Sequence, residues 1–163
     1  ENCPSRKTVD TIVCEKVAIS GAQVGEMLQG GKNTTLYSDE RNKFGKTYNT
    51  FLITDENKNV YCLGLRDICN KSSRTTLETF KEILSDISEV CSEDTENIGN
   101  EILCNLRNFI SDRAKTNIAF TDMLVDYRKE IMPHISNSWD ELDLEQRDAC
   151  CRINNFFVVY TCL

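Results

Sequence analysis

Residues 34–65 decide the fold, and they read TTLYSDERNKFGKTYNTFLITDENKNVYCLGL. Three runs of β-branched, aromatic and aliphatic residues alternate here with two polar turns, one through Gly45 and one over residues 55–59. The runs lie at 36–39, 48–54 and 60–65. Such runs separated by turn residues are typical of β-hairpins. We therefore expect a three-stranded antiparallel meander, with Asp39 at the end of its first strand.

The segment after the meander predicts two helical stretches and one further strand. Thr75-x-x-Glu78 is a capping box, and apolar residues follow it at helical spacing as far as residue 91. The helical period returns over residues 98–106 and ends in the short apolar step 109–110. We expect this step to be a fourth strand.

The remaining C-terminal sequence predicts two more helices and an ambiguous tail. Apolar residues at helical spacing cover 120–131, and Pro133 is expected to close that helix. Ser138-x-x-Glu141 is a second capping box and is expected to open another helix. The apolar run 156–163 predicts either a fifth, buried strand or the end of a helix, because periodicity does not separate the two in a short run.

The N-terminal sequence predicts two short helices ahead of the sheet. Valine and isoleucine residues at 8–17 share one helical face, and a second apolar pattern follows Ser20 and stops at Gly30-Gly31. We therefore expect a helical N-terminal extension over residues 1–33 and a core over residues 34–163.

Composition and charge restrict the function. The chain has 163 residues, and 26 acidic against 19 basic side chains give a formal net charge of −7. One compact domain fits this length, and an acidic chain is a poor candidate for tight, unaided DNA binding. No stretch approaches the roughly 20 apolar residues of a membrane span, so no membrane association is expected.

Cysteine usage points to an intracellular protein. The nine cysteines include no C-x-x-C pair, and His134 is the only histidine, so zinc-finger and thioredoxin-like spacings are absent from the sequence. Several cysteines, Cys91 and Cys104 among them, occupy apolar positions of the expected helices. We expect reduced thiols that pack as small hydrophobic side chains.

Two aspartates are the candidate site. The crossing from residue 69 to 107 exceeds the dozen or so residues that a parallel connection requires, so the fourth strand can return beside the first. Asp39 and Asp112 would then follow neighbouring strands about 4.8 Å apart, and a divalent cation would compensate their charges. The alternative is that Asp112 only caps the next helix. Asp67, at the end of the third strand, is expected to be a turn residue separated from Asp39 by one strand.

Several segments in combination resemble the RNase H-like catalytic cores of DDE-type cut-and-paste transposases, particularly transposon-derived animal proteins akin to the hAT group. The matching segments are 35–39, 43–46, 63–67, 75–81, 111–114 and 127–157. The resemblance implies an α/β fold, in which an RNase H-like mixed sheet joins the meander to one or two parallel strands, with flanking helices. It also implies that Asp39 and Asp112 are the first two metal-holding carboxylates, with Mg²⁺ or Mn²⁺ as cofactor. DNA would be the substrate if the chain is part of a longer protein, and the nucleus would be a candidate compartment.

Three departures from the family pattern bear on activity. Glu40 stands where the family often has a small residue, so its charge must turn away or find a partner. The family's Cys-x-x-His step would fall on Val158 and Thr161, and the insertion leading to a third carboxylate is not in the sequence. We therefore expect a core truncated at its C-terminus and inactive as given, and whether it is an enzyme stays open. The alternative is a non-catalytic protein-interaction module of the same fold, which offers the apolar run 156–160 to a protein partner.

Overall fold

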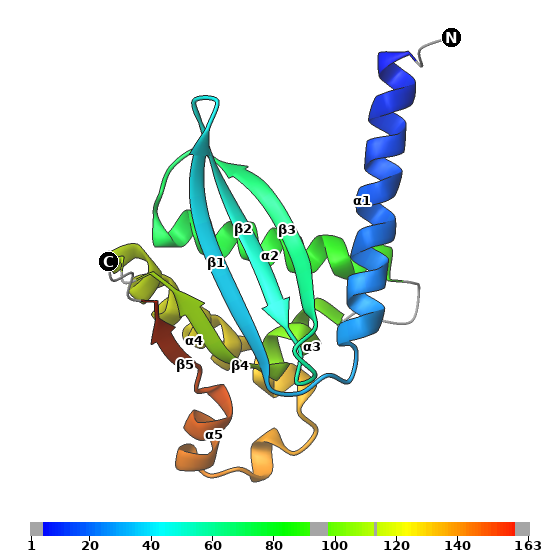
Figure 1. Ribbon diagram of the computed structural model, residues 1–163. Helices are drawn as coiled ribbons and strands as arrows, with labels where there is room; N and C mark the ends of the chain where they lie inside the picture. The colour runs from blue at the N-terminus through cyan, green and yellow to red at the C-terminus, as the bar shows by residue number, and fades with distance from the viewer. Residues whose placement is uncertain (1–4, 92–97, 113, 159–163) are drawn as a thin grey trace.

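The computed structural model describes residues 5–91, 98–112 and 114–158, and its centre is one five-stranded mixed sheet (Figure 1). The strand order is β3-β2-β1-β4-β5. The strands are β1 (Thr34–Lys43), β2 (Lys46–Thr54), β3 (Val60–Ile68), β4 (Leu106–Ser111) and β5 (Asn154–Phe157). The helices are α1 (Arg6–Leu28), α2 (Ser73–Val90), α3 (Ile98–Asn105), α4 (Lys115–Ile135) and α5 (Leu144–Cys151), and a short 3₁₀ helix, η1, covers Trp139–Glu141. The expectation of an α/β fold with a mixed sheet and flanking helices is confirmed.

The antiparallel meander is confirmed, but its first strand is longer than expected. β1 pairs with β2, and β2 pairs with β3, both antiparallel. Asp39 does not end β1; it lies opposite Thr50 inside the ladder, which continues to Lys43 opposite Lys46. Only Phe44 and Gly45 form the turn, and both have positive φ, at 54° and 74°. A two-residue turn of this handedness matches the twist of the strands and lets the polar residues before it stay paired.

The parallel return of the fourth strand is also confirmed. β4 lies parallel to β1, with Tyr37 opposite Ile110. It begins at Leu106, a residue whose position in the apolar pattern had indicated helix. In the ambiguous tail, residues 156 and 157 belong to the strand β5 (154–157), which is parallel to β4, so the strand alternative is confirmed. The expected burial is wrong, because β5 is an edge strand and Phe156 is 52% exposed. Residues 159–163 lie outside the described part of the chain.

Two helix ends differ from the capping patterns in the sequence. α2 starts one turn early: the Ser72 hydroxyl accepts a hydrogen bond from the Thr75 amide at 3.1 Å, so Ser72 is the N-cap. Pro133 does not close α4, which continues to Ile135, because a proline in the last turn removes a single helical hydrogen bond.

The second expected capping box is displaced. Ser138 opens only the 3₁₀ turn η1, without a side-chain cap. The α-helix that follows, α5, starts from Asp143, which forms a full capping box with Gln146. The helix-start signal in this region was therefore placed five residues too early.

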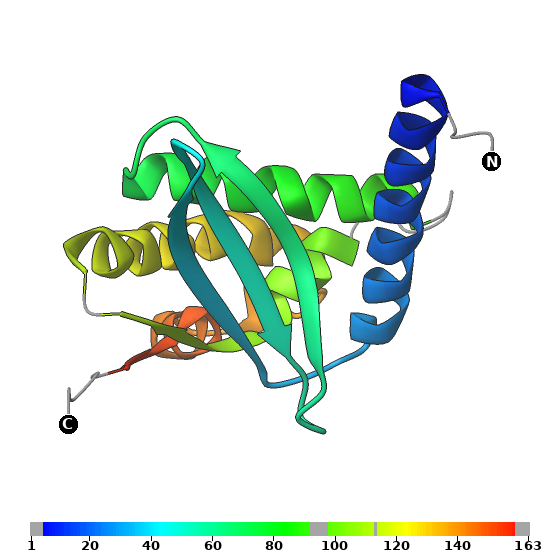
Figure 2. The same cartoon turned by 45° about the horizontal axis from the view of Figure 1, so that its top comes forward.

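The two N-terminal helices expected from the sequence form one continuous helix, α1. Ser20 does not interrupt it, and only its C-terminal end is buried, through Val24, Gly25 and Leu28. Gly25 lies against the sulfur of Cys91, the residue that follows α2; a Cβ added to Gly25 would come within 2.1 Å of that sulfur. The rest of α1 stands away from the body beside β3 (Figures 1 and 2).

The core lies between one face of the sheet and the helices α2 and α4. Inward-facing side chains of the strands, represented by Leu36, Phe51 and Phe109, are fully buried. The Phe51 ring lies 5.1 Å from that of Phe80 on α2, and the Phe109 ring 5.3 Å from that of Phe120 on α4. We call this side of the sheet the covered face. Figure 2 shows β1, β2 and β3 in front of both helices.

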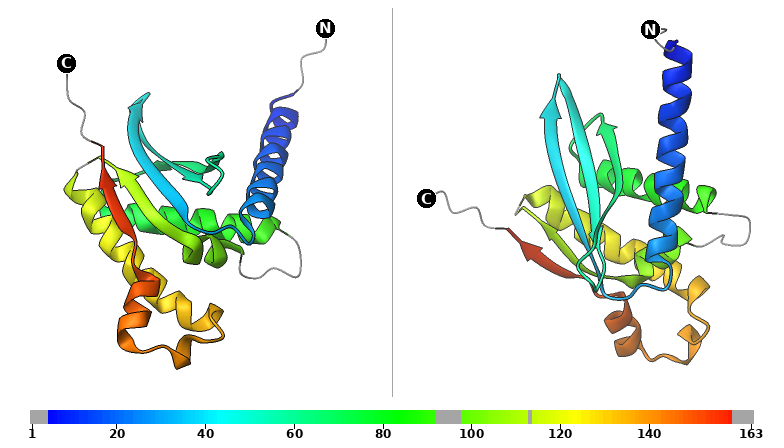
Figure 3. Two further views of the ribbon diagram at one scale, coloured as in Figure 1. Left: turned by 60° about the horizontal axis from the view of Figure 1, so that its bottom comes forward. Right: turned by 45° about the vertical axis from the view of Figure 1, so that its right-hand side comes forward.

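The opposite side of the sheet, the open face, carries the alternate residues of the same strands. Its half-buried members are represented by Tyr37, Leu52 and Ile110. The described helices do not cover it in any view (Figures 2 and 3). None of the helices that the structure describes is long and apolar enough to cross a membrane.

The cysteine side chains in the described residues have free thiols. Cys91 is buried as expected, whereas Cys104 is half-buried. Burial raises the pKa of both thiols, which disfavours the reactive thiolate. Cys3 and Cys162 lie outside the described part of the chain.

Candidate functional site

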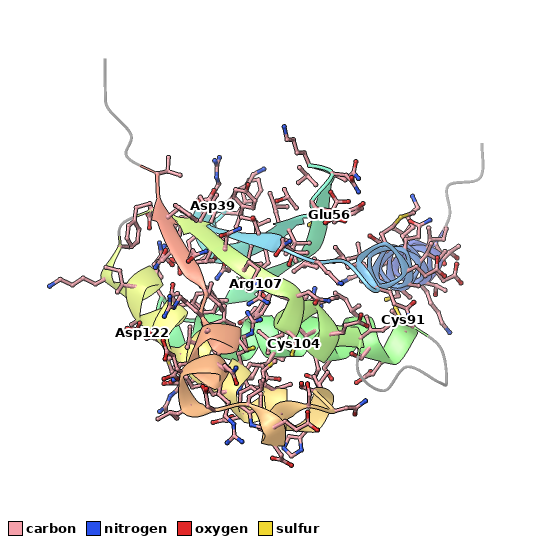
Figure 4. The ribbon with its side chains drawn as sticks, turned by 90° about the horizontal axis from the view of Figure 1, so that it is seen from below. Asp39, Glu56, Cys91, Cys104, Arg107 and Asp122 are labelled. Carbon is pink, nitrogen blue, oxygen red and sulfur yellow. The ribbon has the colours of Figure 1, made fainter. Side chains whose placement is uncertain are left out.

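A cavity of about 320 Å³ opens on the open face where β1 and β4 run side by side. Its lining residues come from β1, β2, β4 and the segments that follow β4 and β5. They are Tyr37, Ser38, Asp39, Thr50, Leu52, Ile110, Ser111, Asp112 and Val158. Both aspartates singled out from the sequence are among them, and Figure 4 shows Asp39 beside the ends of β4 and β5.

The parallel register brings the two aspartates to the same cavity. Tyr37 of β1 lies opposite Ile110 of β4. Asp39 is two residues after Tyr37, and Asp112 is two residues after Ile110. The two aspartates therefore lie at equivalent positions along neighbouring segments. Residues two apart in a strand share a face, which places Asp39 on the open face with Tyr37. The arrangement follows from the parallel pairing and not from the end of β1, since β1 continues past Asp39.

Asp39 forms an ion pair within its own strand. Its Oδ2 accepts a hydrogen bond from Arg41 Nε at 2.9 Å. Both side chains are well exposed, at 66% for Asp39 and 83% for Arg41. An exposed pair of this kind contributes little to stability, so the Arg41 guanidinium can leave the carboxylate at small cost.

Asp112 is held by the start of α4. Its Oδ1 accepts hydrogen bonds from the Ala114 amide at 3.2 Å and from Asn117 Nδ2 at 2.6 Å. The sequence offered the alternative that Asp112 caps the next helix. Asp112 does bond to the first turn of α4, although the N-cap residue is Ala114. Within the described residues both bonds use Oδ1, which leaves Oδ2 as the oxygen available to a cation.

A buried polar pair lies beneath the site on the covered face. Ser38 donates a hydrogen bond to Asn49 Oδ1 at 3.0 Å, and Asn49 is fully buried. The amide Nδ2 of Asn49 has no partner among the described residues. Sequence reasoning missed this pair because polar strand residues usually face solvent. The signal was the alternation: Asn49 shares its face with Phe51 and Ile53.

Two further carboxylates, those of Glu40 and Asp67, each lie beside a lysine. Glu40 points to the covered side and lies 3.7 Å from Lys71 Nζ, so its charge both turns away and finds a partner, as expected. Asp67 is not the turn residue that the sequence predicted: it lies inside β3, opposite Tyr48. It accepts a hydrogen bond from Lys46 at 2.8 Å, which lowers the pKa of the Asp67 carboxyl. β2 separates Asp67 from Asp39, as the sequence predicted.

The donor set at the cavity fits a hard divalent cation better than zinc. Mg²⁺ is usually bound by one or two carboxylates, with water and substrate phosphates completing its octahedron. Asp39 and Asp112 supply two carboxylates, and the Thr50 side chain also lines the cavity. Over residues 5–91, 98–112 and 114–158, no group of three or more histidine, cysteine, aspartate or glutamate side chains is placed to hold a metal ion.

Two comparisons with known proteins found no match. No family model matches the chain, and no curated protein matches it. The function is therefore argued from the residues and the fold.

Proposed function

We propose that this chain is an RNase H-like domain related to the catalytic cores of DDE-type, hAT-like transposases, which cleave and transfer DNA strands with divalent metal. In this proposal Asp39 and Asp112 are the first two metal ligands, and Mg²⁺ or Mn²⁺ is the cofactor. DNA is the substrate of a longer protein that contains the domain, and the nucleus is its compartment. The proposed domain covers residues 34–163.

The observation that supports this proposal is the juxtaposition of the two aspartates on one cavity. An antiparallel β1–β2 pair and a parallel β1–β4 pair bring Asp39 and Asp112 there from distant parts of the chain. The combination of segments that resembles the family carries the same two residues. Fold alone would not argue function, so the weight rests on the carboxylates.

Each residue at the cavity has a role in the proposal. Asp39 and Asp112 would bind the cation, and the cation when bound would activate a water molecule or a DNA 3′-hydroxyl. Asn117 orients Asp112 through its 2.6 Å hydrogen bond. Arg41 supplies the positive charge that Asp39 meets in the absence of metal.

The proposal assigns low or no catalytic activity to the chain as given. Two carboxylates bind Mg²⁺ weakly without substrate phosphates, and no third carboxylate is assigned. Metal binding is therefore the property to measure, because it does not depend on turnover.

The test is a Mn²⁺ titration of the chain, with bound ion followed by electron paramagnetic resonance. Asp39→Asn and Asp112→Asn each remove one charge and keep an oxygen acceptor, so Asn117 and the first turn of α4 retain their bond. We expect each variant to weaken Mn²⁺ binding at least about tenfold, because the loss of even a residue that orients a metal ligand typically costs about that much affinity.

The matched control is Asp122→Asn, an exposed aspartate of α4 that lies apart from the cavity (Figure 4). It should bind Mn²⁺ like the unmodified chain. If Asp39→Asn and Asp112→Asn also bind Mn²⁺ unchanged, the metal site is wrong.

A second candidate function is a protein-interaction module of the same fold. Phe156 of the edge strand β5 is 52% exposed, and Val158 after it is 42% exposed. Exposed apolar side chains on an edge strand favour association. Light scattering separates this function from the first, because association through this edge should persist in Asp39→Asn and disappear in Phe156→Ser.

A further inference from the structure

The hairpin between β1 and β2 projects beyond the rest of the sheet (Figures 1 and 3). Its end carries basic and aromatic side chains in an otherwise acidic chain of net charge −7. We define the hairpin patch as Arg41, Lys43, Phe44, Lys46 and Tyr48.

Strand alternation puts the basic residues of the patch on the open face with Asp39. Asp39, Arg41 and Lys43 are spaced two apart in β1, and such residues point to one side of a sheet. Their partners in β2 are Thr50, Tyr48 and Lys46. Arg41, Lys43 and Lys46 therefore place three basic groups on the open face between the cavity and the hairpin tip. Arg41 is paired there with Asp39, and Lys46 with Asp67.

Phe44 is an unfavourable residue for the hairpin tip, both because of its backbone conformation and because its apolar ring faces water. Its side chain is 88% exposed, and its φ of 54° is a region that residues other than glycine, asparagine and aspartate rarely adopt. Turns of this type favour asparagine or aspartate at this position. The neighbouring Lys43 Nζ lies 5.1 Å from the centre of the Phe44 ring. Packing within the described residues gives no reason for an aromatic ring here.

We propose that the hairpin patch binds single-stranded nucleic acid, with Phe44 stacking on a base and Lys43, Lys46 and Arg41 contacting phosphates. An exposed aromatic ring beside basic side chains is the combination that non-specific single-strand binding uses, since every base has a face on which a ring can stack. The negative charge elsewhere on the chain limits the affinity and makes binding strongly dependent on salt.

This inference goes beyond the proposed metal site because it requires no cation. Two ion pairs of the patch, Arg41 with Asp39 and Lys46 with Asp67, are both exposed. A phosphate can replace either carboxylate as the partner of the basic group. Binding in the presence of EDTA therefore tests the patch alone, whatever the outcome for Asp39 and Asp112.

The experiment is fluorescence anisotropy of a labelled thymidine oligonucleotide about 20 nucleotides long, titrated with the chain in EDTA at about 25 mM salt. Phe44→Ala is expected to raise the Kd about tenfold, the typical effect of losing one stacked base. Lys43→Ala combined with Lys46→Ala should also raise the Kd about tenfold. It should reduce the slope of log K against log salt by about 1.4, since two phosphate contacts are lost.

Matched controls come from other exposed positions. Leu144→Ala removes an apolar side chain that is 78% exposed, and Lys7→Ala with Lys32→Ala removes two exposed charges. These variants should bind the oligonucleotide as the unmodified chain does. Circular dichroism verifies that every variant is folded.

Three results would overturn the proposal. One is the absence of an anisotropy change for the unmodified chain, and another is equal affinity of patch and control variants. The third is displacement of the oligonucleotide by poly-glutamate together with no effect of Phe44→Ala, which would identify the patch as a binding surface for acidic protein.

Discussion

The two faces of the sheet are built from the same strands and serve different purposes. On the covered face Leu36, Phe51 and Ile53 are fully buried against helices. On the open face their immediate neighbours Tyr37 and Leu52 are only half-buried and line the cavity. The period of two in a strand thus divides one sequence into a set that stabilises the fold and a set that is available to a ligand.

The division holds for polar residues as well. Ser38 and Asn49 lie on the covered face, where the Ser38 hydroxyl donates a buried hydrogen bond to Asn49 Oδ1 and Asn49 Nδ2 has no partner among the described residues. Asp39, the residue after Ser38, is exposed and forms an ion pair with the long, exposed side chain of Arg41. Glu40, on the covered side, is largely removed from water and lies beside Lys71, whereas Asp39 keeps its hydration and can exchange partners.

The largest difference between the faces should appear on truncating neighbouring side chains of β2. Phe51→Ala removes a fully buried ring that touches both Phe80 and Phe120, and about 3 to 5 kcal/mol of stability should be lost. Leu52→Ala, on the open face, should cost about 1 kcal/mol. Urea unfolding measures both, and equal losses would show that the open face is packed in solution.

A smaller loss of stability is expected from Arg128 of α4, whose side chain is almost completely buried. Its guanidinium donates hydrogen bonds to the carbonyl oxygens of Cys104 and Leu106, at the junction between α3 and β4. Arg128→Ala leaves these carbonyls without their donor, so we expect a loss of about 2 to 4 kcal/mol in urea unfolding.

The adjacent Lys129→Ala is the control for this variant. Lys129 forms an exposed ion pair with Asp148 at 3.0 Å, and exposed pairs contribute little. A similar loss of stability in both variants would mean that the Arg128 hydrogen bonds do not hold the junction.

The smallest effect should come from the Lys46–Asp67 ion pair at the hairpin. Its hydrogen bond lowers the pKa of Asp67 from the ordinary 3.8 and raises the pKa of Lys46 from 10.5. The stabilisation is therefore present above pH 3.8 and is lost as the pH falls through the pKa of Asp67 in the folded chain. It is likewise lost at alkaline pH, as the pH rises through the pKa of folded Lys46.

Urea unfolding of the chain and of Lys46→Met across this pH range checks the pair. The difference between their midpoints should be small at neutral pH and should vanish below the folded pKa of Asp67. A difference that persists in strong acid would have to come from packing of the lysine stem and not from the charge pair.

Local patterns predicted the strands better than the helix ends. The composition of residues 34–65 predicts the meander because strand and turn residues there agree with the tertiary structure. The starts of α2 and α5 were misplaced because several hydroxyl and carboxyl side chains compete to cap a helix. Ser72 and Asp143 prevail over Thr75 and Ser138 in the packed chain. Both observed caps bond to a residue three positions later, so the sequence contained their signals beside the competing ones.

The site was predictable to the extent that it depends on topology. The crossing is long enough to permit the parallel return of β4, and this return brings Asp39 and Asp112 to one cavity. The ion pair with Arg41 and the Asn117 bond to Asp112 were not predicted, because they depend on side-chain directions. The packing of Gly25 against Cys91, a contact between distant parts of the sequence, was not predicted either.

The parallel pairing of β1 with β4 makes the cavity depend on contacts between distant parts of the chain. Asp39 belongs to a hairpin of local contacts, whereas Asp112 follows β4, which β2, β3, α2 and α3 separate from β1 in the sequence. Pairing between segments so distant in the chain is slow, because a long loop must close before its contacts form. An isolated β1–β3 meander would therefore keep one carboxylate and the hairpin patch, yet have no cavity between two strands.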